Sequence, residues 1–85
     1  AVNNFDIKKY VSVYPNPVST VLNIENKSNE SISNIAIYTI NGALVKEIKS
    51  SEAMQTIPVS DLQNGIYFVK IELNNQVINY KFSKK

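Results

Sequence analysis

The 85-residue sequence predicts an all-β protein, a small sandwich of seven antiparallel strands. Ile and Val dominate its apolar residues while Asn and Ser are frequent between them, which is the residue usage of strands joined by polar turns. The apolar runs are short, and turn signals recur at intervals of about ten residues. No amphipathic helix of useful length is expected. A barrel is the competing way to close such a set of strands.

Each expected strand is a short run in which apolar and polar residues alternate, so that one face is buried. The alternation is clearest at residues 66–73, where Tyr67, Val69, Ile71 and Leu73 share a face. The expected strands cover residues 10–14, 21–25, a run around 35–37, 44–48, 54–59, 66–73 and 78–82.

The segments between these runs contain residues that end strands. Pro15-Asn16-Pro17 ends the first strand, because neither proline has an N–H for a ladder. Residues 26–31 form a polar loop, and Asn41-Gly42 is a dipeptide that favours a two-residue type I′ turn. Pro58 is expected to place the fifth strand at a sheet edge. Residues 60–65 predict a compact turn, or a single helical turn capped at its first residue.

The last strand is expected to bury Ile78, Tyr80 and Phe82, with Lys81 and Lys84 on the opposite face. Apolar faces from both halves of the chain would then meet between two sheets. The expected core comprises Val11, Val13, Leu22, Ile35, Ile37, Tyr67, Val69, Ile71, Ile78, Tyr80 and Phe82.

Composition argues against several classes of function. The chain has no Cys and no His, which removes disulfides, thiolate nucleophiles, imidazole bases and the common zinc sites. All nine basic residues are lysines against seven acidic residues, so the bidentate fork of Arg, which grips phosphate and reads guanine, is missing and nucleic acid is a poor partner. No run approaches the roughly 20 apolar residues of a membrane-spanning helix.

Nothing in the sequence predicts a catalytic, metal or cofactor site. The carboxylates lie in or beside polar segments, without a His or Arg to complete a proton relay. Asp61 to Gly65 lacks the alternating oxygen ligands of a calcium loop. A pair of glycosidase carboxylates is disfavoured in a domain too small to build a cleft around a sugar.

The order of several short motifs resembles the C-terminal sorting domain, type A, of the type IX (Por) secretion system of Bacteroidota. The resemblance covers residues 10–85, and no single motif is specific, whereas their order and spacing are. The motifs are Val13-Tyr14-Pro15-Asn16-Pro17, Leu22-Asn23-Ile24, Ile37-Tyr38 with Asn41-Gly42, Leu62-Gln63-Asn64-Gly65-Ile66-Tyr67-Phe68-Val69, and Lys81-Phe82.

This resemblance implies a seven-stranded Ig-like β-sandwich without enzymatic activity. It implies an address label that follows an N-terminal cargo, engages a shuttle protein and the outer-membrane translocon, and is removed by a sortase-like cysteine peptidase. The cargo would pass through the periplasm to the cell surface or the medium. Because Ala1 begins without Met or a leader, we expect a piece of a longer or processed chain, with residues 1–9 as a linker remnant and 10–85 as the domain.

The candidate recognition residues are Lys81, Phe82, Ser83, Lys84 and Lys85. They are read equally well as an edge strand guarded by lysines and as a place where a partner adds a strand. The remaining motif residues are interpreted as structural, with turns at Pro15, Asn16, Pro17, Gly42 and Gly65 and a core aromatic at Tyr67.

Two other functions stay open at the level of sequence. An Ig-like or fibronectin-like accessory module could hold carbohydrate or protein at a cell surface, because such folds host many functions. Carbohydrate platforms usually display exposed aromatics, whereas this chain has no Trp and places most of its Tyr and Phe in core alternation. The third possibility is a spacer without a partner.

Overall fold

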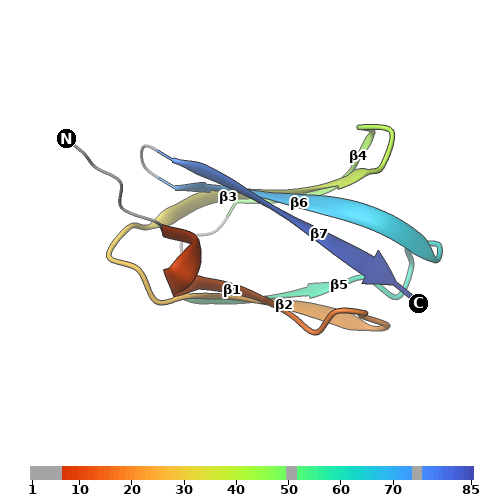
Figure 1. Cartoon of the computed structure of the whole chain (residues 1–85), viewed down its shortest axis with the longest axis horizontal. Helices are drawn as coiled ribbons and strands as arrows, with labels where there is room; N and C mark the ends of the chain where they lie inside the picture. The colour runs from red at the N-terminus through yellow and green to blue at the C-terminus, as the bar shows by residue number, and fades with distance from the viewer. Residues whose placement is uncertain (1–6, 50–51, 74–75) are drawn as a thin grey trace.

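The chain folds into two antiparallel sheets that face each other, as the computed structural model shows (Figure 1). The structure describes residues 7–49, 52–73 and 76–85. Its elements are the 3-10 turn η1 (Ile7–Tyr10) and the strands β1 (Val11–Tyr14), β2 (Val21–Asn26), β3 (Ile32–Thr39), β4 (Leu44–Ile48), β5 (Met54–Pro58), β6 (Gly65–Leu73) and β7 (Val77–Lys84).

The strand order is β1-β2-β5 in one sheet and β4-β3-β6-β7 in the other. The prediction of seven antiparallel strands in two layers is therefore confirmed, and the barrel is not formed. The fifth strand lies at an edge of its sheet, as Pro58 predicts, because a residue without an N–H is tolerated there. No helix among the described residues is long and apolar enough to cross a membrane.

The core lies between the two sheets and is built from the alternating faces. Leu22, Ile24, Ile57, Val69 and Ile71 are completely buried. The residues that the sequence predicts for the core all take part in it, with Val13 and Tyr80 half-buried against it. Val18, Ile32, Val59 and Leu73 complete it.

The hairpin between β3 and β4 differs from the predicted two-residue type I′ turn. The Gly42 N–H donates to the Thr39 carbonyl at 2.9 Å, so Ile40 and Asn41 are the central residues of the turn. A type I′ turn needs positive φ at both central residues, and among the described residues only glycines have positive φ. Gly42 follows the turn with φ of 92°, which is the arrangement of a three-residue loop closed by a left-handed glycine.

The turn between β5 and β6 is compact and has no helical segment. The Leu62 N–H donates to the Val59 carbonyl at 3.0 Å and closes it. Of the two forms expected for residues 60–65, the simple turn is the one observed.

The last strand corrects one predicted orientation. Lys84 was expected opposite the core, but it shares the inner face with Ile78, Tyr80 and Phe82 and is only 7% exposed. Residues two apart in a strand point to the same side, so Lys84 must follow Phe82 inward for as long as the strand continues.

Candidate recognition surface at the C-terminal strand

β7 is the edge strand of the four-stranded sheet and supplies four of the five candidate recognition residues, and Lys85 follows it directly. Along β6, Gly65 lies opposite Lys84, Tyr67 opposite Phe82 and Phe68 opposite Lys81. Lys81 and Lys85 are exposed and Ser83 is half-buried, whereas Phe82 is 1% exposed. A partner can therefore reach Lys81, Ser83 and Lys85 directly, while Phe82 belongs to the core.

The Pro15-Asn16-Pro17 motif packs against the end of this strand. The Val18 N–H donates to the Ser83 carbonyl at 2.9 Å, and the Lys85 N–H donates to the Val18 carbonyl at 2.9 Å. The Ser83 N–H donates to the Asn16 side-chain oxygen, also at 2.9 Å. We call this set of contacts between Asn16, Val18, Ser83 and Lys85 the clasp. It joins the end of β7 to the loop between β1 and β2, with Val18 and Lys84 as a parallel bridge.

The residues that follow each proline make the hydrogen bonds of the clasp. Pro15 and Pro17 have no N–H to donate. Asn16 accepts with its side-chain oxygen, and Val18 donates with its backbone N–H. Val18 is 1% exposed, which anchors the loop in the core. The motif is thus more than the strand-ending turn that its sequence predicts.

The clasp covers only the end of the β7 edge. Ser83 directs both its N–H and its carbonyl away from β6 and into the clasp. Because backbone groups of an antiparallel strand alternate in direction, those of Asn79 and Lys81 also point away from β6. Within the described part of the chain, no backbone group is bonded to them on that side. Asn79 and Lys81 therefore form a short open edge next to a closed one.

Tyr67 and Gly65 lie on β6, opposite residues of β7. The ring of Tyr67 stacks on that of Phe82, with centroids 5.6 Å apart and planes at 18°. The Tyr67 hydroxyl donates to the Gln63 carbonyl at 2.7 Å, and the residue is 7% exposed. Gly65 has φ of 155°, which side chains rarely adopt, at the point where the turn enters β6. Gly42 lies apart from these residues, in the β3–β4 hairpin.

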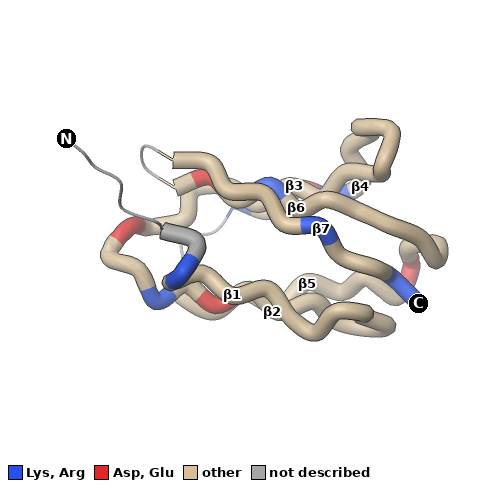
Figure 2. The backbone as a smooth tube through the Cα atoms, in the orientation of Figure 1, with Lys and Arg blue, Asp and Glu red and all other residues tan. Residues whose placement is uncertain are grey.

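The end of β7 is basic. Figure 2 shows lysines at the C-terminal end of this strand. Nearby, the Lys46 ammonium lies 3.1 Å from a carboxylate oxygen of Asp61. That hydrogen bond lowers the pKa of Asp61 below its ordinary value, with a smaller contribution from the charge of Lys84. The lysines on both sides of Asp61 thus favour its ionised form.

The described surface is made of strand edges and exposed side chains. The part of the chain that the structure describes has no pocket and no cluster of three acidic, His or Cys side chains that could hold a metal ion. What it presents is an open strand edge, exposed lysines and a clasp.

The sequence missed the clasp, because contacts between residues 16–18 and 83–85 span almost the whole chain. One signal pointed to it: Val18 is the only apolar residue in a run of proline and polar residues from Pro15 to Thr20, and an isolated apolar residue in a turn needs a place to be buried.

Comparison with known families shows which family the chain resembles. The family model of the secretion system C-terminal sorting domain, Por_Secre_tail, matches residues 12–85. The match includes all the motif residues discussed above. A search of curated proteins found no match.

Proposed function

The chain belongs to the family of secretion system C-terminal sorting domains, and from this premise we propose how it is recognised. Membership implies a sorting signal that leads to export, to the cell surface or the medium, through contact with the secretion machinery. The match over residues 12–85 is the observation that carries this function. We propose that the chain is a type A domain of a Bacteroidota type IX system and acts without catalysis of its own.

The proposed contact is the open edge of β7 together with the exposed lysines. A partner strand can pair with the outward backbone groups of Asn79 and Lys81, as in other cases of strand addition. Lys81 and Lys85 would attract an acidic surface and raise the rate of encounter. The shuttle protein and the outer-membrane translocon are the proposed partners.

The proposed frame for this contact is an Ig-like sandwich. In immunoglobulin letters, β1, β2 and β5 correspond to strands A, B and E, which face C′, C, F and G. Tyr67 lies at the start of the strand equivalent to F and donates to a carbonyl four residues upstream. A tyrosine in this position is a hallmark of Ig-like domains and supports the assignment.

The cargo would precede residues 1–9, which we propose as linker, and residues 10–85 would form the domain. A sortase-like cysteine peptidase would cut between cargo and domain after passage from the periplasm across the outer membrane. Of the proposed linker, residues 1–6 lie outside the described part of the chain. Ile7–Tyr10 forms η1, which leads directly into β1.

The test uses residues 1–85 fused to the C-terminus of a periplasm-targeted fluorescent reporter, in a Bacteroidota host with and without a working translocon. We expect reporter outside the cell only when the translocon works. Retention in both strains, with the domain folded, would contradict the function and favour an accessory binding module.

A second comparison tests the β7 edge. Deleting residues 81–85 would abolish export, but it also removes Phe82, a core residue, and so confounds folding with recognition. Lys81→Pro removes the outward N–H together with the lysine charge and blocks strand addition, while the ladder with β6 is kept. Lys81→Ala is the matched control, because it removes the same charge and keeps the N–H. We expect export to fall further in the proline variant at an unchanged denaturation midpoint. Equal export of the two variants would rule out strand addition at this edge.

A further inference from the structure

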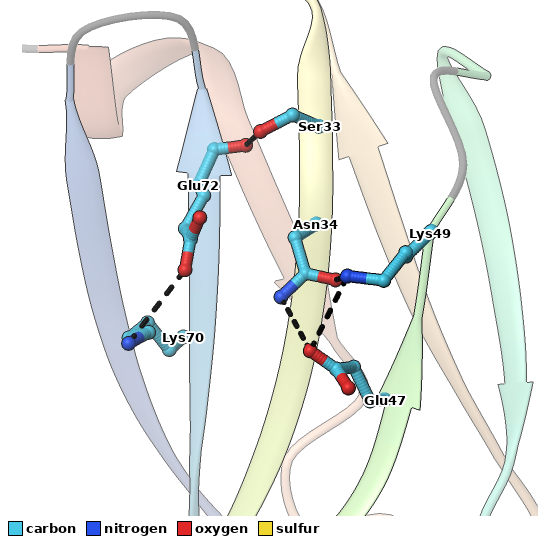
Figure 3. A network of polar contacts seen from close by, with 6 residues as sticks. All are labelled: Ser33, Asn34, Glu47, Lys49, Lys70 and Glu72. Carbon is cyan, nitrogen blue, oxygen red and sulfur yellow. Dashed lines mark hydrogen bonds and ion pairs between the residues drawn. The ribbon is translucent and has the colours of Figure 1, made fainter.

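The outer face of the four-stranded sheet is divided into two unlike halves. The half nearer the start of β3 is polar, with a network of hydrogen bonds and ion pairs (Figure 3). The Asn34 amide donates to Glu47 at 3.1 Å, and Lys49 lies 3.7 Å from Glu47. Lys70 lies 3.6 Å from Glu72 across the same face. This is the solvated outer face expected of an antiparallel sandwich.

The other half is apolar. Tyr38 lies opposite Leu44 on one side and Phe68 on the other, so their side chains share the outer face. Ile66 precedes Phe68 on the same face by two residues, and Ile40 follows Tyr38 into the hairpin. We call Tyr38, Ile40, Leu44, Ile66 and Phe68 the apolar half-face.

Folding does not account for this half-face. Ile40 is 63% exposed, Leu44 52% and Ile66 38%, while Tyr38 and Phe68 are half-buried. The core lies on the opposite side of the sheet, so these side chains gain little from the packing of the monomer. A contiguous exposed apolar surface with a polar border commonly marks an interaction site.

Two lysines border the half-face, Lys81 and Lys70, of which Lys70 forms an ion pair with Glu72. Lys81 lies opposite Phe68 in the register, and the Lys70 ammonium stands 5.8 Å from the centre of the Tyr38 ring. The carboxylates of this outer face, Glu47 and Glu72, lie in the polar half, each beside a lysine. A complementary partner would therefore carry carboxylates around an apolar centre. A second copy of the chain would instead bring lysines against lysines.

We propose that the apolar half-face is a docking surface for a folded protein whose own apolar patch is bordered by carboxylates. It adjoins the open β7 edge, because Lys81 is part of that edge and lies opposite Phe68 of the half-face, so one partner would cover the two together. The inference rests on the proposed function, since it adds a second contact surface to the same secretion partner.

The test compares substitutions at the two ends of one sheet face in the reporter fusion. Leu44→Ser and Ile66→Thr remove apolar surface from the half-face. Val77→Thr is the matched control, because Val77 is 53% exposed on the same face but in the polar half. The charge pair is Lys81→Glu against Lys27→Glu, where the control side chain is 69% exposed in the loop after β2. Denaturation midpoints report whether each variant is folded.

We expect each half-face variant and Lys81→Glu to reduce export about tenfold, the loss typical of one central interface side chain. The two controls should export as the unchanged domain does. A folded Ile66→Thr and Leu44→Ser pair that is exported normally would overturn the inference while the proposed function stands. An unchanged fusion that is never exported would overturn both.

Two further measurements on the isolated domain separate other occupants of the half-face. Sedimentation reports self-association, and flotation with vesicles of anionic phospholipid reports membrane binding. A monomer that stays free of vesicles agrees with a protein partner. A dimer, or vesicle binding, that is lost on Ile66→Thr would overturn the assignment to an acidic protein surface.

Discussion

Replacing Tyr67 tests how the start of β6 supports the C-terminal strand. The ring is buried, 7% exposed, and stacks on Phe82 at 5.6 Å. Its hydroxyl donates to the Gln63 carbonyl at 2.7 Å. Tyr67→Ala removes all of these contacts, and Tyr67→Phe removes only the hydrogen bond.

The magnitudes follow from the surroundings of the ring. Removing a large core aromatic costs about 3 to 5 kcal/mol, and aromatic pairs add about 1 kcal/mol to the loss. Gln63, whose carbonyl accepts the Tyr67 hydroxyl, is exposed, so water can partly fill the space. We therefore expect about 3 kcal/mol for Tyr67→Ala. For Tyr67→Phe we expect about 1 kcal/mol, the net value of one hydrogen bond.

Equilibrium denaturation with urea measures both variants against the unchanged domain. A domain of this size has a total stability of roughly 4 to 13 kcal/mol, so Tyr67→Ala should remain measurable but strongly weakened. Tyr14→Phe is the matched hydroxyl control, because Tyr14 is 38% exposed and should change stability by less than about 0.5 kcal/mol. An unchanged midpoint for Tyr67→Ala would refute the reasoning and make Tyr67 a contact residue.

Three other predictions concern the turns and the charged groups. Asn16→Ala should remove the acceptor of the Ser83 N–H in the clasp. The Ser83 amide hydrogen should then exchange with solvent faster, as measured by NMR, and an unchanged exchange rate would contradict the clasp. Gly42→Ala should lower the free energy of unfolding by about 1 kcal/mol, measured by urea denaturation. The Cβ of the alanine would have free space, but a φ of 92° is unfavourable for alanine. An unchanged free energy of unfolding would refute this backbone strain. Because Lys46 lowers the pKa of folded Asp61, the pair should stabilise the domain above the ordinary pKa of Asp, about 3.9, and lose that effect as pH falls through the folded pKa. Denaturation midpoints of Lys46→Ala, measured from pH 2 to 6, should show a weaker dependence on pH, because a backbone hydrogen bond and Lys84 still lower the pKa of Asp61. The same acid profile in the variant and the unchanged domain would exclude the contribution of Lys46.

The strands and the core could be read from the sequence, because each depends on a local period. Alternation at Tyr67, Val69 and Ile71 predicts the central strand, and the structure buries all three. Pro58 predicts an edge, because a missing N–H excludes a central ladder wherever the strand is placed. The turn type of the β3–β4 hairpin could not be predicted as well from the sequence. Asn41-Gly42 suits several turn types, and the pairing of β3 with β4 selects among them.

The recognition surface stays a prediction, and the structure changes its description. The lysines of residues 81–85 predict a recognition element at the C-terminal strand. Residues 81–85 are predicted from the sequence as one recognition surface. In the structure Phe82 and Lys84 are buried, and Lys81 and Lys85 are exposed.

The sequence by itself determined which segments become strands, which face of each is buried and which chemistries are absent, because these follow from neighbouring residues and from residue types. Tertiary structure alone decided that Asn16 and Val18 close the end of β7 and that Tyr38, Leu44 and Phe68 meet on one outer face. The physical reason is that strand order and register bring together residues far apart in the chain. No local period encodes such a pairing, and only the packing of the two sheets selects it.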